Sequence, residues 1–269
     1  MSQVLLRFSI GFVAVALAVA ALSLYLSGLQ LAEQERLSST GDLEGAMQSA
    51  EMAQRLDPFS AEPLETEAYL LQLQGRNQEA EQVFQQAADR APHEYSIPQQ
   101  LGSLRLGLMD EPLEAAESYE RALELNPRDS ISREGVATAY LSAGELEEAK
   151  RQYEESRRMG GLSAEQSYDL GRIYARTGEA GEGADTLREA ERRAAAELQQ
   201  MSGQDYQQQI QFIQSIELAL ADALAVDRRY AEARQVLVES EADQAATILS
   251  LINSNPEGYR LTVMDSDVY

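Results

Sequence analysis

The chain has 269 residues, of which 44% are hydrophobic, and it contains no cysteine and no tryptophan. Its formal net charge is −23, and because such a surface repels phosphate groups, we expect neither nucleic acid binding nor broad adhesion to anionic lipid. Without cysteine the chain has no disulfide, no thiolate zinc site and no lipid-modified cysteine.

A long uncharged segment, residues 8–32, follows a short stub, residues 1–7. Its 25 residues (32 − 8 + 1) form about 37 Å of helix at ~1.5 Å per residue, enough to cross a ~30 Å hydrocarbon core with some tilt. Ala18 and Ala20 also fit the Ala-x-Ala cleavage site of a secretory signal peptide. Because the apolar character continues past Ala20 to Leu31, the pattern favours an uncleaved transmembrane helix.

The charges around this segment predict its orientation. Arg7 and the amino terminus precede it, and Arg36 is the only basic residue close behind it. Since basic residues stay on the cytoplasmic side, this balance favours a single-pass membrane protein with the remaining chain outside the cytoplasm. The first repeat helix falls at residues 27–38 with no proline before it. We therefore expect one long helix that packs on a second helix at 43–56, with Gly41 in the turn.

Small and aromatic residues then recur with a fixed period. Ala122, Ser156 and Ala190 are each 34 residues apart (156 − 122 and 190 − 156). Other sets with this spacing are Tyr119, Tyr153 and Leu187; Ala115, Ala149 and Gly183; Ala137 and Gly171; Tyr140 and Tyr174; and Gly144 and Gly178. Between Ala80 and Ala115 the spacing is 35 (115 − 80), which places one extra residue in the turn at 109–111. A period near 34 is the signature of stacked helical hairpins.

The predicted elements follow in chain order. A repeat array occupies residues 33–197, with helices expected at 62–73, 78–90, 97–108 and 112–125, then helix pairs within 130–163 and 164–197. Asp110 is the expected N-cap of the helix at 112–125. The second helix of the unit at 164–197 is expected to be unusually long, over residues 180–201. Residues 198–252 hold an elongated, degenerate last repeat at 206–239, which begins with a long helix at 206–226, and a capping helix at 243–252. Residues 253–269 show no helical period and are expected to be a mobile tail.

The unit at residues 130–163 resembles the tetratricopeptide repeat, which has a small residue and an aromatic in its first helix and Ala, aromatic, Ala in its second. The resemblance covers roughly residues 27–252. It implies an all-α, right-handed solenoid whose concave groove, lined by the first helix of each pair, holds a protein or peptide partner. Carried over to this chain, the groove residues are Tyr69, Gln72, Gln99, Ser103, Leu106, Glu134, Thr138, Leu141, Tyr168, Arg172 and Arg176. None of these is the Lys or Asn with which some family members clamp chaperone tails.

A second resemblance rests on AQRLDPFSAE at residues 53–62, close to a membrane segment. It is similar to the repeat tails of O-antigen ligase and polymerase family proteins. The chain has only one predicted span and none of their multi-span catalytic domain. This resemblance implies at most an accessory subunit of envelope polysaccharide assembly.

The sequence offers no catalytic, cofactor or metal site. Its only histidine, His93, follows Pro92 in a turn and has no partner pattern for general base or metal work. We therefore predict a non-enzymatic scaffold without cofactor or small-molecule substrate, and the near-absence of lysine suggests a GC-rich bacterial source. The repeats could instead face the cytoplasm and recruit soluble enzymes to the membrane.

Tyr168, Arg172 and Arg176 recur at intervals of four, so they share one stripe of a helix. On a strongly acidic chain, two arginines beside an aromatic point to a contact with a carboxylate-bearing partner. The alternative is that each arginine pairs with a neighbouring acid, Glu134 or Glu165.

Overall fold

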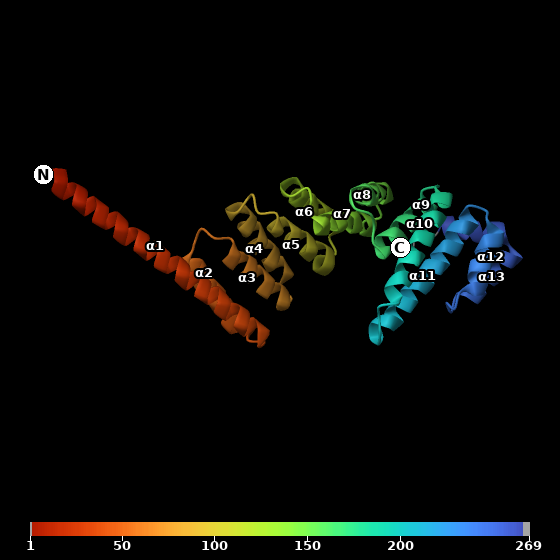
Figure 1. The fold of residues 1–269 in the computed structure, drawn as a ribbon, viewed down its shortest axis with the longest axis horizontal. Helices are drawn as coiled ribbons and strands as arrows, with labels where there is room; N and C mark the ends of the chain where they lie inside the picture. Colours follow the sequence, from red (N-terminus) through yellow and green to blue (C-terminus); the bar gives the residue numbers. More distant parts are fainter. Residues whose placement is uncertain (1, 266–269) are drawn as a thin grey trace. The chain divides into compact units, whose positions relative to one another are not determined.

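The structure is a computed structural model that describes residues 2–265, with side chains from residue 12 onward (Figure 1). The described residues form α-helices and short turns, together with one π-helical segment, and contain no strand. The chain divides into two compact units, Met1–Gly135 and Val136–Tyr269, which are described in turn. The prediction of an all-α, repeat-built fold is confirmed.

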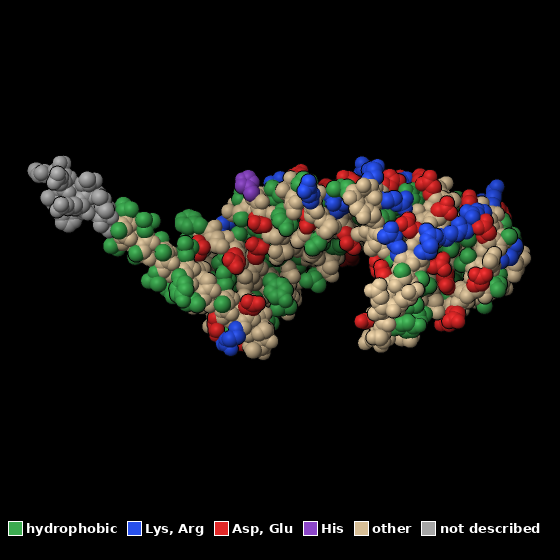
Figure 2. Space-filling model, in the orientation of Figure 1, with side chains coloured by type: hydrophobic (Ala, Val, Ile, Leu, Met, Phe, Trp, Pro, Cys, Tyr) green, Lys and Arg blue, Asp and Glu red, His purple; other side chains and the backbone are tan. Residues whose placement is uncertain are grey.

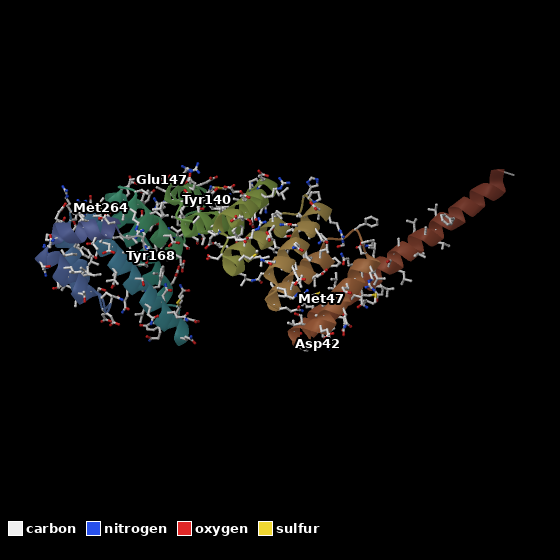
Figure 3. The ribbon with its side chains drawn as sticks, turned by 180° about the vertical axis from the view of Figure 1, so that it is seen from behind. Asp42, Met47, Tyr140, Glu147, Tyr168 and Met264 are labelled. Atoms are coloured by element: carbon white, nitrogen blue, oxygen red, sulfur yellow. The ribbon has the colours of Figure 1, made fainter. Side chains whose placement is uncertain are left out.

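The first unit opens with α1 (Ser2–Ser39), a single unbroken helix. It turns at Gly41, whose φ of +84° favours glycine, and returns as α2 (Leu43–Leu56), which begins at the N-cap Asp42. Figure 3 labels Asp42 at this end of the hairpin. The expected fusion of the apolar segment with the first repeat helix is therefore confirmed.

The rest of the first unit is a stack of antiparallel helix pairs. These helices are α3 (Glu62–Leu73), α4 (Asn77–Arg90), α5 (Ser96–Leu104), α6 (Pro112–Leu125) and α7 (Ser130–Ser142), which crosses into the second unit. The predicted bounds of α3 and α6 match the structure. Alanines at the small-residue positions are fully buried where the helices meet, as Ala80 and Ala115 show.

The extra residue of the 35-residue interval lies inside a helix. A π-helical segment, η1 (Arg105–Met109), continues α5. From Gly102 to the turn residue Asp110 there are eight steps (110 − 102). In the preceding repeat the corresponding interval, from Ala68 to Gly75, is seven residues (75 − 68). Because a π-turn bonds five rather than four residues back, it absorbs one inserted residue without changing the helix register on either side.

This arrangement corrects the expected role of Asp110. It is not the N-cap of α6, because that position belongs to Glu111, which makes no side-chain cap bond. Asp110 instead ends η1 in the left-handed conformation at φ +59°. Gly75 and Gly144 have the same positive φ at the corresponding turns of the neighbouring repeats. Asp110 therefore occupies a position that is glycine in those repeats.

Glycines in the first unit make room for an aromatic ring. A Cβ on Gly102 would lie 2.9 Å from the Tyr119 ring, and one on Gly135 would lie 2.5 Å from it. The ring therefore lies between two helices that approach closely only because both residues are glycine. Its hydroxyl is 3.0 Å from the Ser103 hydroxyl.

The second unit is also built of helix pairs, and some of its helices are longer. It contains the end of α7 and the helices α8 (Leu146–Met159), α9 (Ala164–Arg176), α10 (Ala180–Leu198), α11 (Gln204–Val226), α12 (Tyr230–Glu239), α13 (Ala245–Ser254) and α14 (Pro256–Asp265). α10 has 19 residues and α11 has 23, against 14 in α8, so the predicted lengthening is confirmed. A capping box between Ser163 and Gln166 fixes the start of α9.

The core of the second unit extends to its carboxyl-terminal end. α9 and α10 meet at Gly171 and Gly183, where a Cβ on Gly183 would lie 2.7 Å from the Gly171 carbonyl oxygen. Leu187 fills the remaining space and is fully buried. At the far end, Ile252 of α13 is buried against the same core, as expected of a capping helix.

The prediction that residues 253–269 carry no helix is wrong. Residues 256–265 form α14, and residues 266–269 lie outside the described part of the chain. Asn255 accepts a hydrogen bond from the Gly258 amide at 2.9 Å, and Pro256 occupies the first position, so the break after α13 is also a helix start. No residue of α14 is fully buried, which explains why no helical period is visible in its sequence.

Candidate functional site

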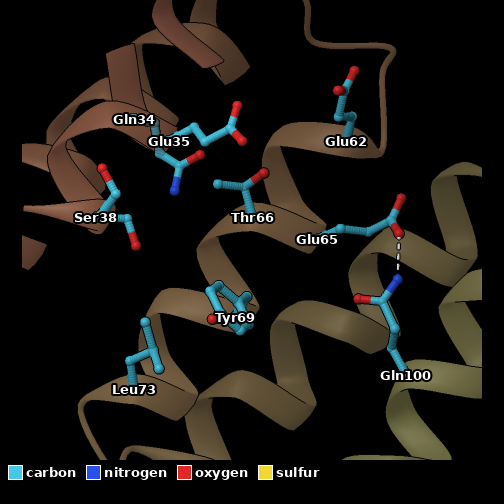
Figure 4. A pocket seen from close by; sticks show the side chains of 10 residues that line it. Gln34, Glu35, Ser38, Glu62, Glu65, Thr66, Tyr69, Leu73 and Gln100 are labelled. Atoms are coloured by element: carbon cyan, nitrogen blue, oxygen red, sulfur yellow. Dashed lines mark hydrogen bonds between the residues drawn. The ribbon is translucent and has the colours of Figure 1, made fainter. Parts of the chain in front are cut away.

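In the first unit, the first helices α1, α3 and α5 enclose a hollow of ≈ 610 Å³ (Figure 4). Of the predicted groove residues, Tyr69 lies in this hollow, with 51% of its side chain exposed. Leu73, one helical turn further along α3, extends the apolar surface. We call this site the α1–α3–α5 pocket.

Four other predicted residues, on α3, α5 and η1, do not line the pocket. Gln99 donates a hydrogen bond to the Asp129 carboxylate at 2.6 Å, and Ser103 is bonded to Tyr119, so both support the fold. Gln72 and Leu106 are half-buried. Sequence reasoning placed these residues on the correct helices but did not separate those that pack from those that face the hollow.

The three predicted residues of α7 line neither of the pockets described here. Glu134 is exposed and Thr138 is half-buried. Leu141 packs against the core cluster that contains Tyr153 and Tyr174. Their assignment to a partner site remains a prediction.

The predicted stripe of α9 is brought together in the second unit. The Arg172 guanidinium carbon lies 5.2 Å from the centroid of the Tyr168 ring, a cation–π contact. Tyr168 in turn meets Phe212 edge-on, with ring centroids 5.6 Å apart, and packs against the core. Figure 3 labels Tyr168 on α9. The tyrosine therefore positions Arg172 as well as offering contact area.

Arg172 and Arg176 line a second pocket of ≈ 330 Å³. Its other walls come from α11 and from α14, the helix that the sequence did not predict. The α14 residues on it are Tyr259, Thr262 and Val263. α14 thus covers part of the face formed by the first helices α9 and α11. We call this site the α9–α11–α14 pocket.

A carboxylate faces the two arginines in this pocket. Burial raises the pKa of Asp222 to about 6, while the hydrogen bond from Tyr259 and the charges of Arg172 and Arg176 act in the opposite direction. The same burial and the neighbouring carboxylate raise the pKa of Tyr259. The pocket therefore contains both signs of charge, and Asp222 balances the arginines from inside.

Comparison with known families identifies the repeat. Residues 109–149 and 136–197 match the tetratricopeptide repeat family. Residues 109–197 therefore form tetratricopeptide repeats. Members of this family are typically non-catalytic scaffolds for protein interaction. No curated protein matches the chain.

Solved tetratricopeptide repeat structures have the same fold. A MamA protein is 18% identical with a TM-score of 0.57, over 66% of this chain and 97% of its own. PilF of Pseudomonas aeruginosa is 15% identical with a TM-score of 0.57, over 88% and 96%. YrrB, described as having an unusual peptide-binding site, is 23% identical with a TM-score of 0.51, over 60% and 82%.

The tetratricopeptide pattern did not reveal two further pocket residues, Asp222 and Tyr259. Asp222 stands alone among apolar residues of α11, between Leu220 and Leu224, and a single acid in such a run is a signal that could have been noticed. Tyr259 gave no signal because its partner is 37 positions away. Among the described residues, no group of three or more His, Cys, Asp or Glu could hold a metal ion.

Proposed function

We propose that this protein is a non-enzymatic, membrane-tethered scaffold in a bacterial cell envelope, which binds protein or peptide partners on the first-helix faces of its repeats. The observation that carries the proposal is α1. One continuous helix provides both an apolar, exposed segment and the first helix of the repeat stack. Within the described chain, Phe12–Ser39 is the one helix long and apolar enough to cross a membrane.

The contacts of α1 suggest where the membrane segment ends. The Ser23 hydroxyl bonds to the carbonyl of Leu56, and the Ser27 hydroxyl bonds to that of Ala53 at 3.1 Å. The last turns of α2 therefore lie beside α1 from Ser23 onward. Because α2 carries Arg55 in its last turn, and charges in hydrocarbon are unfavourable, this part of α1 lies outside the bilayer in our proposal. Residues 2–22 leave about 31 Å of helix, of which the uncharged part, residues 8–22, accounts for about 22 Å, so Arg7 lies at the opposite interface in our proposal.

The same contacts bear on the alternative of a cleaved signal peptide. Cleavage after Ala20 would leave Ser23 and all of its contacts with α2 in place. The two serines thus keep their role in the fold in either case, whereas the apolar residues Leu22, Leu24 and Tyr25 are more than half exposed. Figure 2 shows hydrophobic side chains exposed along α1, which favours retention in a membrane.

The decisive experiment is alkaline carbonate washing of membranes, followed by mass determination of the protein. The proposal predicts full-length protein in the membrane pellet. A soluble product that begins at Ala21 would replace the anchor with a signal peptide but leave the scaffold function intact.

The side of the membrane on which the repeats lie can be determined by labelling a single introduced cysteine, because the chain contains none of its own. A Ser202→Cys variant places one thiol on an exposed residue between α10 and α11. An impermeant maleimide should label it in intact cells if the repeats are extracytoplasmic. Labelling only after lysis would favour the adaptor that recruits cytoplasmic enzymes. Co-purification with a glycan polymerase would favour an accessory role in polysaccharide assembly.

Two features support peptide or protein partners in particular. A structurally similar tetratricopeptide repeat protein, YrrB, has a peptide-binding site. In this chain, Arg172 and Arg176 line the α9–α11–α14 pocket with the stacked Tyr168 beside them. We propose that these residues contact a carboxylate-bearing segment, which would share the pocket with α14 or displace it.

A further inference from the structure

The α1–α3–α5 pocket differs in chemistry from the arginine-lined pocket of the second unit. Its charged residues are Glu35 of α1 and Glu62 and Glu65 of α3, and no Lys or Arg lines it. None of these three carboxylates forms an ion pair within the described chain. Glu65 accepts a hydrogen bond from the Gln100 amide at 2.9 Å, which holds it at the pocket wall (Figure 4).

Partial burial and nearby carboxylates make the charged form of Glu65 less favourable when no cation is present. Burial raises the pKa of Glu65, and the neighbouring carboxylates Glu94 and Glu62 raise it further. A cation placed among these groups would gain attraction from several carboxylates and would relieve their mutual repulsion.

A buried polar group without a partner also points into the pocket. Gln34 of α1 has only 8% of its surface exposed, and within the described chain no hydrogen bond reaches its carboxamide. Figure 4 shows this carboxamide directed across the hollow toward Thr66. Because the described part of the chain supplies no partner for it, this carboxamide is available to hydrogen-bond a group that enters the pocket.

The pocket also has an apolar floor. Tyr69 is 51% exposed and Leu73 is 48% exposed, one turn apart on α3. An aromatic ring and an aliphatic side chain suit the methylene stem of a long basic residue, whose charged end would reach the glutamates. The carboxamide oxygen of Gln34 can accept a hydrogen bond from the same cationic group.

From these features we infer that the α1–α3–α5 pocket binds an extended peptide segment through an Arg or Lys side chain, inserted over Tyr69 and held by Glu62, Glu65 and Gln34. This inference rests on the proposed scaffold function and adds the chemistry of one partner. It also gives the two units different ligand preferences, because the pocket of the second unit is lined by arginines.

The test is a degenerate heptapeptide library with each residue type fixed in turn at its central position, probed with the full-length protein in detergent. We expect enrichment of Arg and Lys at the fixed position and depletion of Asp and Glu. A fluorescent peptide built from the selected sequence should bind the Glu62→Gln/Glu65→Gln variant at least ~10-fold more weakly, since each removed charge pair is partly desolvated.

A matched control removes the same charge elsewhere. Glu114→Gln/Glu117→Gln changes two exposed glutamates of α6 that line neither pocket, and it should bind the peptide as the parent does. Gln34→Leu, which removes the unpaired amide, should weaken binding by ~3-fold or more without lowering the unfolding temperature.

Several outcomes would overturn the inference. Equal losses in the two double variants would show only a general effect of net charge. Selection of acidic residues alone would support the scaffold and its α9 stripe but contradict a cationic ligand here. A library that the protein does not select at all would count against both the pocket and the proposed peptide-binding function.

Discussion

The Tyr259 hydroxyl donates a hydrogen bond to the Asp222 carboxylate, and this bond ties the last described helix to the first-helix face of the second unit. Two contacts on the exposed side of α14 support it. Glu257 accepts a hydrogen bond from Tyr230 at 2.8 Å and forms an ion pair with Arg228 at 3.3 Å. Exposed ion pairs contribute little, so the attachment of α14 depends mainly on Tyr259 and Asp222.

Asp222 should make the stability of the second unit depend on pH. Its pKa is raised from 3.8 to about 6 in the fold, so the folded state binds the proton more tightly than the unfolded chain does. Its contribution is therefore complete below about pH 4 and is lost as the pH rises through about 6, a change of up to about 3 kcal/mol. Asp222→Asn, which stays neutral, should become more stable relative to the parent between pH 4 and pH 7. Thermal unfolding at one-unit pH intervals measures this, and parallel curves for the two proteins would contradict it.

Gly171 should not tolerate a larger side chain. A Cβ there would lie 2.6 Å from the Leu187 Cγ and 3.1 Å from the Gly183 carbonyl oxygen. Gly171→Leu should therefore lower the free energy of unfolding by about 1–3 kcal/mol or more, because the helices must separate. The control is Glu147→Gln, which removes only an ion pair between Lys150 and a largely exposed glutamate and should cost less than about 0.5 kcal/mol. Equal effects of the two changes in thermal unfolding would mean that the repeat register is wrong.

The arginines of α9 should contribute to partner capture. Arg172→Ala/Arg176→Ala is expected to weaken binding of a partner recovered from membranes by about 2 kcal/mol or more, while the helical content is unchanged. Arg151→Ala/Arg158→Ala on α8 is the matched control, since both residues are exposed and the charge change is the same. Retention of the same partners with the same salt dependence would show that the α9 stripe is structural.

Phe59 should report where the membrane surface lies. Its side chain is 88% exposed, and it follows α2 closely after Leu56, whose carbonyl bonds to Ser23 of α1. With the bilayer ending near Leu22, Phe59 lies at the interface, where aromatic side chains are favoured. Because the chain has no tryptophan, Phe59→Trp gives a single fluorophore. Its emission in nanodiscs should be quenched by lipids brominated near the headgroup, whereas a Tyr206→Trp control in the first turn of α11 should not be quenched.

The local sequence determined most of the repeat architecture. Ala, Gly and aromatic residues at a spacing of 34 fixed the helix pairs, because close helix contacts accept only small residues and leave room for specific rings. Tyr119 between Gly102 and Gly135 illustrates this. The fusion of the apolar segment with the first repeat was also predictable, since residues 8–39 contain no proline, and the two glycines there, Gly11 and Gly28, lie inside the continuous helix α1.

Only the tertiary structure decided how the candidate sites are built. The 35-residue interval shows that one residue is inserted, but it does not show where. The π-helical turn before Asp110 takes up this residue because α5 must keep its packing contacts on both sides of the insertion. α14 has too few buried residues for a periodic signal, and its attachment joins Tyr259 to a carboxylate 37 residues earlier. Gln34, Glu62 and Glu65 likewise line one pocket only because α2 packs against both α1 and α3. Helices form from contacts a few residues apart, but a pocket forms from contacts between helices, and its residues carry no fixed spacing in the chain.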